Sequence, residues 1–141
     1  MKITERQYNE RWSEIIESDL DWREREEAKD KLWREYIEGV EVGDRMNVKL
    51  WTDVEPCTVI KRTAKSITVR YDKAELDPNW EAKWVIGGFS AICTNDHEQK
   101  WIITEDKDSQ RTETFRLTKL GWAHNGCLCN PGWRKYYDYN F

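Results

Sequence analysis

Near its middle the sequence reads Cys57-Thr58-Val59-Ile60-Lys61-Arg62-Thr63-Ala64-Lys65-Ser66-Ile67-Thr68-Val69-Arg70-Tyr71. In the second half of this run Ile67, Val69 and Tyr71 alternate with polar residues, which is typical of a strand with one buried face. Only Thr63-Ala64-Lys65 separates this strand from a preceding one at 57–62. We therefore predict a tight β-hairpin with strands at 57–62 and 66–71.

The residues just before the hairpin also have a period of two. Met46, Val48 and Leu50 would share one side of a strand, with polar residues and Trp51 on the other side. This pattern begins after Val40 and predicts the first strand of the β region.

Upstream of residue 40 the apolar side chains recur at helical spacing, and residues 4–38 are predicted to be helical. The segment starts with Thr4-Glu5-Arg6-Gln7, a capping-box pattern. Ser18-Asp19-Leu20-Asp21 can cap or kink a helix, so we expect either one long helix or two. Glu38-Gly39 supplies the end, because glycine can take the left-handed conformation that closes a helix.

Downstream of the hairpin the pattern is less regular. Asp77-Pro78-Asn79 breaks the chain, and we expect a long inserted loop at about 74–100. Residues 101–104 and 112–117 flank a polar turn and predict a second hairpin. The tyrosine-rich tail 133–141 is expected to add a last strand that closes the sheet.

These elements predict an α+β protein. Residues 1–39 form an acidic amphipathic helical region, and residues 40–141 form a small, strongly bent antiparallel barrel of SH3-like type, with the loop at about 74–100 inserted in it.

Composition and charge exclude several classes of protein. The chain has 141 residues, of which 35% are charged and 13% aromatic, so it is expected to fold around a core of its own. It contains no apolar run of the length of a membrane span and no apolar segment near Met1, so export and membrane insertion are not expected. The four cysteines are expected to be reduced.

The net charge of −4 comes from one part of the chain. Residues 2–38 hold eight basic and twelve acidic residues, while the remainder is balanced. Phosphate binding draws on a basic surface, so the helical region is not expected to bind nucleic acid. It fits a protein partner with a basic face.

The β region resembles a group of small uncharacterised proteins encoded by phages, prophages and related mobile elements of bacteria. The resemblance extends from about residue 42 to the Tyr-Asp-Tyr-Asn-Phe end, and its motifs are residues 49–53, 56–60, 62–70, 72–77, 87–89 and 93–101. It implies a bacterial cytoplasmic setting and an accessory role outside the virion, and it implies no activity. The acidic helical region lies outside it.

The first functional hypothesis is a non-enzymatic protein that binds a host protein or ribonucleoprotein complex. The most concrete form is an inhibitor or modulator of a nucleic-acid-processing or immune complex, similar to an anti-CRISPR protein, whose acidic helices occupy a basic groove. The candidate contact residues lie in the second half of the helical region and are Trp22, Glu24, Glu26, Glu27, Asp30 and Trp33. The helices also carry an aromatic stripe of Trp12, Trp22, Trp33 and Tyr36. Because this stripe has more apolar surface than one barrel face covers, a homodimer through these helices is a further candidate.

The alternative hypothesis is a small nucleic-acid-binding module. Its candidate residues are the basic side chains of the hairpin, Lys61, Arg62, Lys65, Arg70 and Lys73, close in sequence to Trp80 and Trp84. The sequence pI near 5.3 makes nucleic acid the less favoured partner.

A second alternative is a zinc- or His97-dependent enzyme. Cys93, His97, Cys127 and Cys129 are weak candidate ligands, with His124 nearby, but their spacings do not match those of structural zinc sites. His97 has the acidity of a general base, yet nothing in the sequence completes a catalytic site around it. We therefore expect no metal, no cofactor and no catalytic residues.

Overall fold

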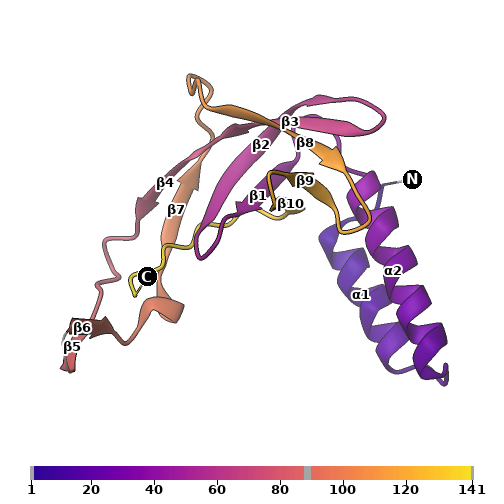
Figure 1. The fold of residues 1–141 in the computed structure, drawn as a ribbon, viewed down its shortest axis with the longest axis horizontal. Helices are drawn as coiled ribbons and strands as arrows, with labels where there is room; N and C mark the ends of the chain where they lie inside the picture. Colours follow the sequence, from indigo (N-terminus) through magenta and orange to yellow (C-terminus); the bar gives the residue numbers. More distant parts are fainter. Residues whose placement is uncertain (1, 88–89, 141) are drawn as a thin grey trace.

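The computed structural model describes residues 2–87 and 90–140 and has an α+β fold. Two antiparallel helices, α1 (Glu5–Ile16) and α2 (Trp22–Glu38), form a helical hairpin at one end of the molecule, and a β region forms the rest (Figure 1). No helix among these residues has the length and apolar character needed to cross a membrane.

The helical region consists of two helices, and the side chain of an N-cap residue stabilises the start of each one. The Thr4 hydroxyl accepts a hydrogen bond from the Gln7 amide, and the Gln7 side chain accepts one from the Thr4 amide, which confirms the capping box. Asp21 caps α2 by accepting from the Glu24 amide at 2.9 Å. Gly39 ends α2 as predicted but not in the left-handed conformation, since its φ is −78°. Instead Lys2 approaches it, and a Cβ there would lie 3.3 Å from the Lys2 Cα.

Six strands form a closed antiparallel barrel in the order β1-β10-β9-β8-β3-β2. Their bounds are β1 Arg45–Lys49, β2 Val54–Arg62, β3 Ser66–Tyr71, β8 Thr112–Leu117, β9 Trp122–His124 and β10 Cys127–Pro131. The hairpin of β2 and β3 is confirmed, with a bulge between Val59 and Lys61. The structure is thus α+β with a closed barrel.

The inward-facing side chains of the barrel form the core. The fully buried residues include Met46, Val48, Cys57, Val59, Ile67, Val69, Phe115, Trp122 and Cys129. The end of α2 joins this core through Ile37, whose carbonyl accepts a hydrogen bond from Trp122 Nε1 at 2.9 Å. This contact anchors the base of the helical hairpin to the barrel.

The segment expected as a loop at 74–100 contains three strands and a short 3-10 helix. Strand β4 (Lys73–Leu76) pairs with β7 (Trp101–Thr104) to form a two-stranded ribbon, and β5 (Trp84–Gly87) pairs with β6 (Ser90–Cys93) to form a second hairpin, which we call the finger. The 3-10 helix η1 is Asp96–Glu98. The finger lies at the end of the molecule opposite the helical hairpin (Figure 1).

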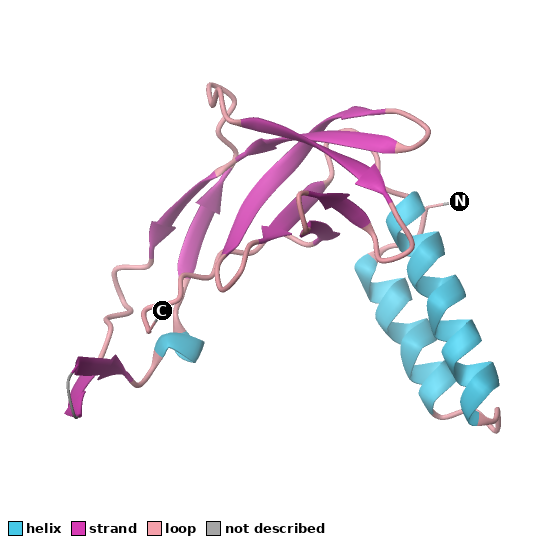
Figure 2. Ribbon diagram, viewed as in Figure 1, coloured by secondary structure: helices cyan, strands magenta, loops and turns pink. Residues whose placement is uncertain are grey.

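Two of the strand pairings expected from the sequence are wrong. Strands 101–104 and 112–117 do not form a hairpin, because β7 pairs with β4 while β8 pairs with β3 and β9. The tail 133–140 does not close the sheet, because β10 already pairs with β1 and β9. The tail instead runs along the ribbon and makes one bridge to the barrel, between Tyr136 and Val54 (Figure 2). Gly88 and Phe89 of the resemblance motif, and Phe141 of the predicted last strand, lie outside the described residues.

Candidate functional site

The strongest concentration of unbalanced charge is at the far end of the helical hairpin. Residues 13–30 contain three basic residues and eight carboxylates, namely Arg23, Arg25 and Lys29 against Glu14, Glu17, Asp19, Asp21, Glu24, Glu26, Glu27 and Asp30. Two of the three basic side chains are used within the hairpin. Arg25 donates to the Ser18 carbonyl at 2.6 Å, and Lys29 pairs with Glu26 at 2.9 Å. The far end therefore presents a mainly negative surface.

The candidate contact residues of α2 do not share one environment. Trp22, Glu24, Glu27 and Asp30 are exposed, and Trp22 keeps 77% of its surface accessible. Glu26 is half-buried and holds Lys29, which lies 5.0 Å from the centroid of the Trp12 ring. All five of these candidate residues of α2 nevertheless lie at the accessible far end of the hairpin.

Trp33 lies at the other end and is a structural residue. Its ring packs at 5.9 Å from Tyr8 and 6.1 Å from Tyr36, and its Nε1 donates to the Leu120 carbonyl at 3.3 Å. Trp33 thus helps to hold the hairpin against the barrel and lies away from the far end.

Two further apolar residues at the far end were not among the six candidate contact residues, although Trp12 belongs to the aromatic stripe noted in the sequence. Trp12 and Ile16 belong to α1, and both are exposed together with Trp22 of α2. No residue of α1 within the described chain is buried. Their helical spacing in the sequence was a signal, but the periodicity could not show which part of the stripe the barrel covers.

Asp21 gives the far end a fixed negative charge. The backbone amide of Glu24 donates to its carboxylate, and this hydrogen bond lowers the pKa of Asp21 from its usual value. The charge sits at the N-terminus of α2, where the helix dipole favours an anion.

The five basic candidates of the β hairpin differ in whether their charged groups are bound within the fold or exposed. Arg62 donates to the carbonyls of Val40 and Glu38, at 2.9 and 2.8 Å, so it joins the helical hairpin to the barrel. Arg70 pairs with Glu105 at 3.3 Å. Lys61, Lys65 and Lys73 remain exposed. Two of the five guanidinium or ammonium groups are therefore used inside the fold.

A basic and hydroxyl-rich face nevertheless exists on the outside of β2, β3 and β8. The Thr68 and Thr114 hydroxyls lie 2.9 Å apart, which shows that they share this face. Arg116 pairs with Ser66 in the ladder between β3 and β8, and both line a shallow pocket with Thr63 and Lys65. Arg116 was not among the sequence candidates.

The candidate metal ligands are not brought together. Cys93 lies in the finger, where its thiol is 3.5 Å from Asn95, while Cys129 lies in the barrel core at 3.9 Å from Cys57. His97 is exposed on η1 between Asp96 and Glu98. Among the described residues no group of three or more His, Cys, Asp or Glu side chains is arranged to hold a metal.

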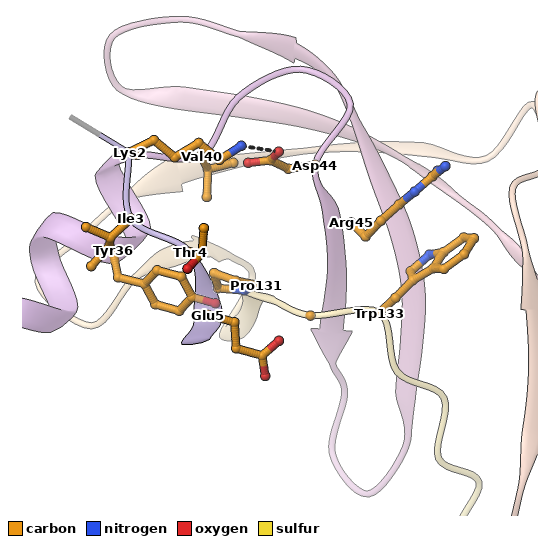
Figure 3. A pocket seen from close by; sticks show the side chains of 12 residues that line it. Lys2, Ile3, Thr4, Glu5, Tyr36, Val40, Asp44, Arg45, Pro131 and Trp133 are labelled. Carbon is orange, nitrogen blue, oxygen red and sulfur yellow. Dashed lines mark hydrogen bonds and ion pairs between the residues drawn. The ribbon is translucent and has the colours of Figure 1, made fainter. Parts of the chain in front are cut away.

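One pocket of about 280 Å³ lies between the start of α1 and the barrel (Figure 3). Its charged groups already have partners. Lys2 pairs with Asp44 at 2.5 Å, and Arg45 lies 4.5 Å from the centroid of the Trp133 ring while also donating to Glu105. Burial, together with nearby Glu5, raises the pKa of Tyr36 to about 12, so this phenol stays protonated near neutral pH. The pocket therefore offers packing and paired charges rather than a group poised for acid–base chemistry.

Comparison of the chain with protein-family models, with curated proteins and with solved structures finds no significant match.

Proposed function

We propose that the protein is a non-enzymatic accessory protein of a phage or related mobile element, which acts in the bacterial cytoplasm by binding a host protein. In its most concrete form it inhibits or modulates a nucleic-acid-processing or immune complex, in the manner of an anti-CRISPR protein. The observation that carries this proposal is the excess of exposed carboxylates at the far end of the helical hairpin, beside Trp12, Ile16 and Trp22.

The physical argument rests on competition for a basic surface. A groove that receives phosphates is lined by Lys and Arg, and a rigid row of carboxylates can bind there with favourable charge and fast association. The α1–α2 pair supplies rigidity, because stacked Tyr8 and Tyr36, with ring centroids 4.5 Å apart, and Trp33 hold its base. The exposed tryptophan at its tip is a residue type enriched in binding hot spots.

The barrel is the scaffold in this proposal, and we propose that it is of SH3-like type. It holds the helical hairpin through Arg62 and Trp122 and leaves the far end of the hairpin in solvent. The contact region we propose is the exposed set Trp22, Glu24, Glu27 and Asp30, extended by Trp12 and Ile16 of α1.

The test uses the purified full chain as bait in a nuclease-treated bacterial lysate. A charge-reversal variant, Glu24→Lys with Glu27→Lys and Asp30→Lys, is compared with a matched control, Glu75→Lys with Glu81→Lys and Asp108→Lys, whose positions are equally exposed. We expect the wild type and the control to retain a host protein that the first variant loses. The retained protein, once purified, should lose affinity for its nucleic acid when the wild type is added.

Equal retention by the two variants would remove the helical hairpin from the mechanism. A retained protein that binds no nucleic acid would contradict the proposed class of target.

A second candidate function is nucleic-acid binding by the outer face of β2, β3 and β8. The supporting observation is that Lys61, Lys65 and Arg116 are exposed on or beside the strands that carry the Thr68–Thr114 pair. The variant Lys61→Glu with Lys65→Glu and Arg116→Glu should then abolish salt-dependent binding of a fluorescent single-stranded oligonucleotide. Absence of such binding by the wild type at low salt would exclude this function.

A further inference from the structure

The finger, made of β5 and β6, differs from the other described strands of the protein in having an edge without protection. The barrel is closed, and the β4–β7 ribbon carries Lys73 and Glu75 along its edge. The run from Trp84 to Cys93 has no charged residue and no proline. Natural proteins usually protect a free edge with such residues, because an open edge invites pairing with another chain.

On both faces of the finger, the described residues include exposed apolar side chains. Ile86 keeps 88% of its surface accessible, and Val85 and Ile92 each keep more than half. An isolated two-stranded sheet is at best marginally stable in water, and a third strand would stabilise it. Among the described residues of the finger, those at its base are covered, where Trp84 packs edge-on against Tyr139.

One of the two edges is already capped by the tail. The Asn140 side chain accepts a hydrogen bond from the Cys93 amide at 2.7 Å and donates one to the Cys93 carbonyl at 2.9 Å. At this position it makes the two hydrogen bonds that a neighbouring strand would make with β6. The other edge belongs to β5. Since the Cys93 backbone groups point outward to Asn140, Trp84 and Cys93 form a non-hydrogen-bonded pair in the β5–β6 ladder.

In an antiparallel ladder, residues alternate between directing their backbone groups toward the partner strand and away from it. This alternation gives the direction of the N–H and C=O groups of each β5 residue. Trp84 and Ile86 direct their N–H and C=O groups away from β6, and among the described residues none of these groups has a partner. β5 therefore presents an open edge on which Trp84 and Ile86 each offer one N–H donor and one C=O acceptor.

We propose that the finger is a homodimerisation element, in which β5 pairs antiparallel with β5 of a second copy of this chain. A twofold axis at Val85 makes the edge self-complementary, because Trp84 of one copy then exchanges hydrogen bonds with Ile86 of the other. The result is a four-stranded sheet with continuous apolar rows on both faces.

Two features of the molecule itself, besides the self-complementary register of β5, favour a second copy as the partner. The finger is uncharged, so two copies meet without like-charge repulsion. The acidic helical hairpin lies at the opposite end of the molecule, so pairing through the fingers keeps the two negative surfaces apart (Figure 1). The dimer does not depend on the partner proposed for the helical hairpin.

The test removes one outward-pointing amide at a time. Ile86→Pro deletes the N–H at the open β5 edge without breaking the β5–β6 ladder, and Ala91→Pro deletes the equivalent N–H at the β6 edge as a matched control. Sedimentation equilibrium should give a wild-type dimer with a Kd on the order of 1–100 μM, because pairing through the four residues of β5 makes a small interface. Ile86→Pro should raise this Kd at least about tenfold, and Ala91→Pro should leave it unchanged.

A cross-link gives a second readout that does not require a proline to be tolerated. Val85→Cys places two thiols opposite each other across the axis, so oxidised glutathione should convert this variant to a covalent dimer. Thr52→Cys, on the exposed β1–β2 loop, should form no covalent dimer under the same conditions. A wild type that stays monomeric at about 1 mM would overturn the proposal. A dimer that survives Ile86→Pro but is lost in Trp12→Ala with Trp22→Ala would assign the contact to the helices instead.

Discussion

The guanidinium carbon of Arg62 lies 4.7 Å from the centroid of the Trp122 ring, and both side chains bind the last turn of α2. Trp122 Nε1 donates to the Ile37 carbonyl, and Arg62 donates to the Glu38 and Val40 carbonyls. These carbonyls lie at or beyond the end of the helix, where no amide of the helix can reach them. The pair thus fixes the angle between the helical hairpin and the barrel.

Replacement of Arg62 by lysine should therefore destabilise the protein although the charge is kept. An ammonium cannot span both carbonyls and stack on the ring, so we expect a loss of about 1–3 kcal/mol in the free energy of unfolding. Urea unfolding followed by circular dichroism measures this loss. The neighbouring exposed Lys61→Met should change stability by less than about 0.5 kcal/mol, and an equally small effect of Arg62→Lys would contradict the anchoring role.

The two tryptophans proposed from the sequence as contact residues should behave in opposite ways. Trp33→Ala removes a ring that packs on Tyr8 and Tyr36 and should lower stability by about 2–4 kcal/mol. Trp22→Ala removes an exposed ring and should lower stability by less than about 0.5 kcal/mol while weakening binding to the captured host protein. Thermal unfolding and the retention assay distinguish the two. A stable Trp33→Ala variant would show that the base of the hairpin is not held by this ring.

Local patterns in the sequence predicted the elements that depend on neighbouring residues. Alternation at Ile67, Val69 and Tyr71 gave the bounds of β3, and Thr4 with Gln7 gave the start of α1. Both signals depend on contacts within a few residues, which sequence patterns describe well. The acidic far end of the hairpin was likewise visible as charge in the sequence.

Long-range pairing was the part that sequence patterns did not predict. β7 pairs with β4 across some thirty residues, and its own pattern does not identify that partner. A local signal for one of the pairings exists at Asn125-Gly126, the dipeptide most typical of a two-residue hairpin turn. Both residues have positive φ, at 49° and 81°, and join β9 to β10, the strand that closes the barrel. The structural role of Arg62 depends on the helix end meeting the barrel and has no local signature.

The thiols of the core should resist alkylation in the folded protein. Cys57 and Cys129 are fully buried with their sulfurs 3.9 Å apart, and the hydrogen bond between them together with burial raises the pKa of Cys57. Because the thiolate is the reactive form, both residues should react with iodoacetamide only as fast as the protein unfolds. Mass spectrometry of peptides after timed labelling gives the rates. Cys127, which is half-buried, should react first, and equal rates at all four cysteines would contradict the closed core.

The ribbon and finger should lose order when Asn95 is replaced. Asn95 is buried, donates to the Glu81 carbonyl at 2.9 Å and accepts from the Lys83 amide at 2.8 Å, so it joins the two sides of the segment that leads to the finger. Asn95→Ala should speed hydrogen exchange at residues 80–87 and 90–100 and leave β2 and β3 protected. Asn79→Ala is a suitable control, because that side chain is exposed in the preceding turn. Faster exchange throughout the barrel would instead show that the two parts unfold together.

Stability should fall at alkaline pH because two tyrosines are held in the neutral form. Burial raises the pKa of Tyr36 to about 12, and burial with the hydrogen bond to Glu113 raises the pKa of Tyr71 further. A tyrosine in the unfolded chain ionises near pH ~10, so the stabilisation is complete below that pH and is lost as the pH rises through the folded-state values. The free energy of unfolding should therefore decline from about pH 10 to 12, and the decline should be shallower in Tyr36→Phe. Between about pH 7 and 9 the two proteins should show no difference in slope, since neither state releases a tyrosine proton there. An identical alkaline slope in the two proteins would show that Tyr36 ionises as freely in the fold as in the unfolded chain.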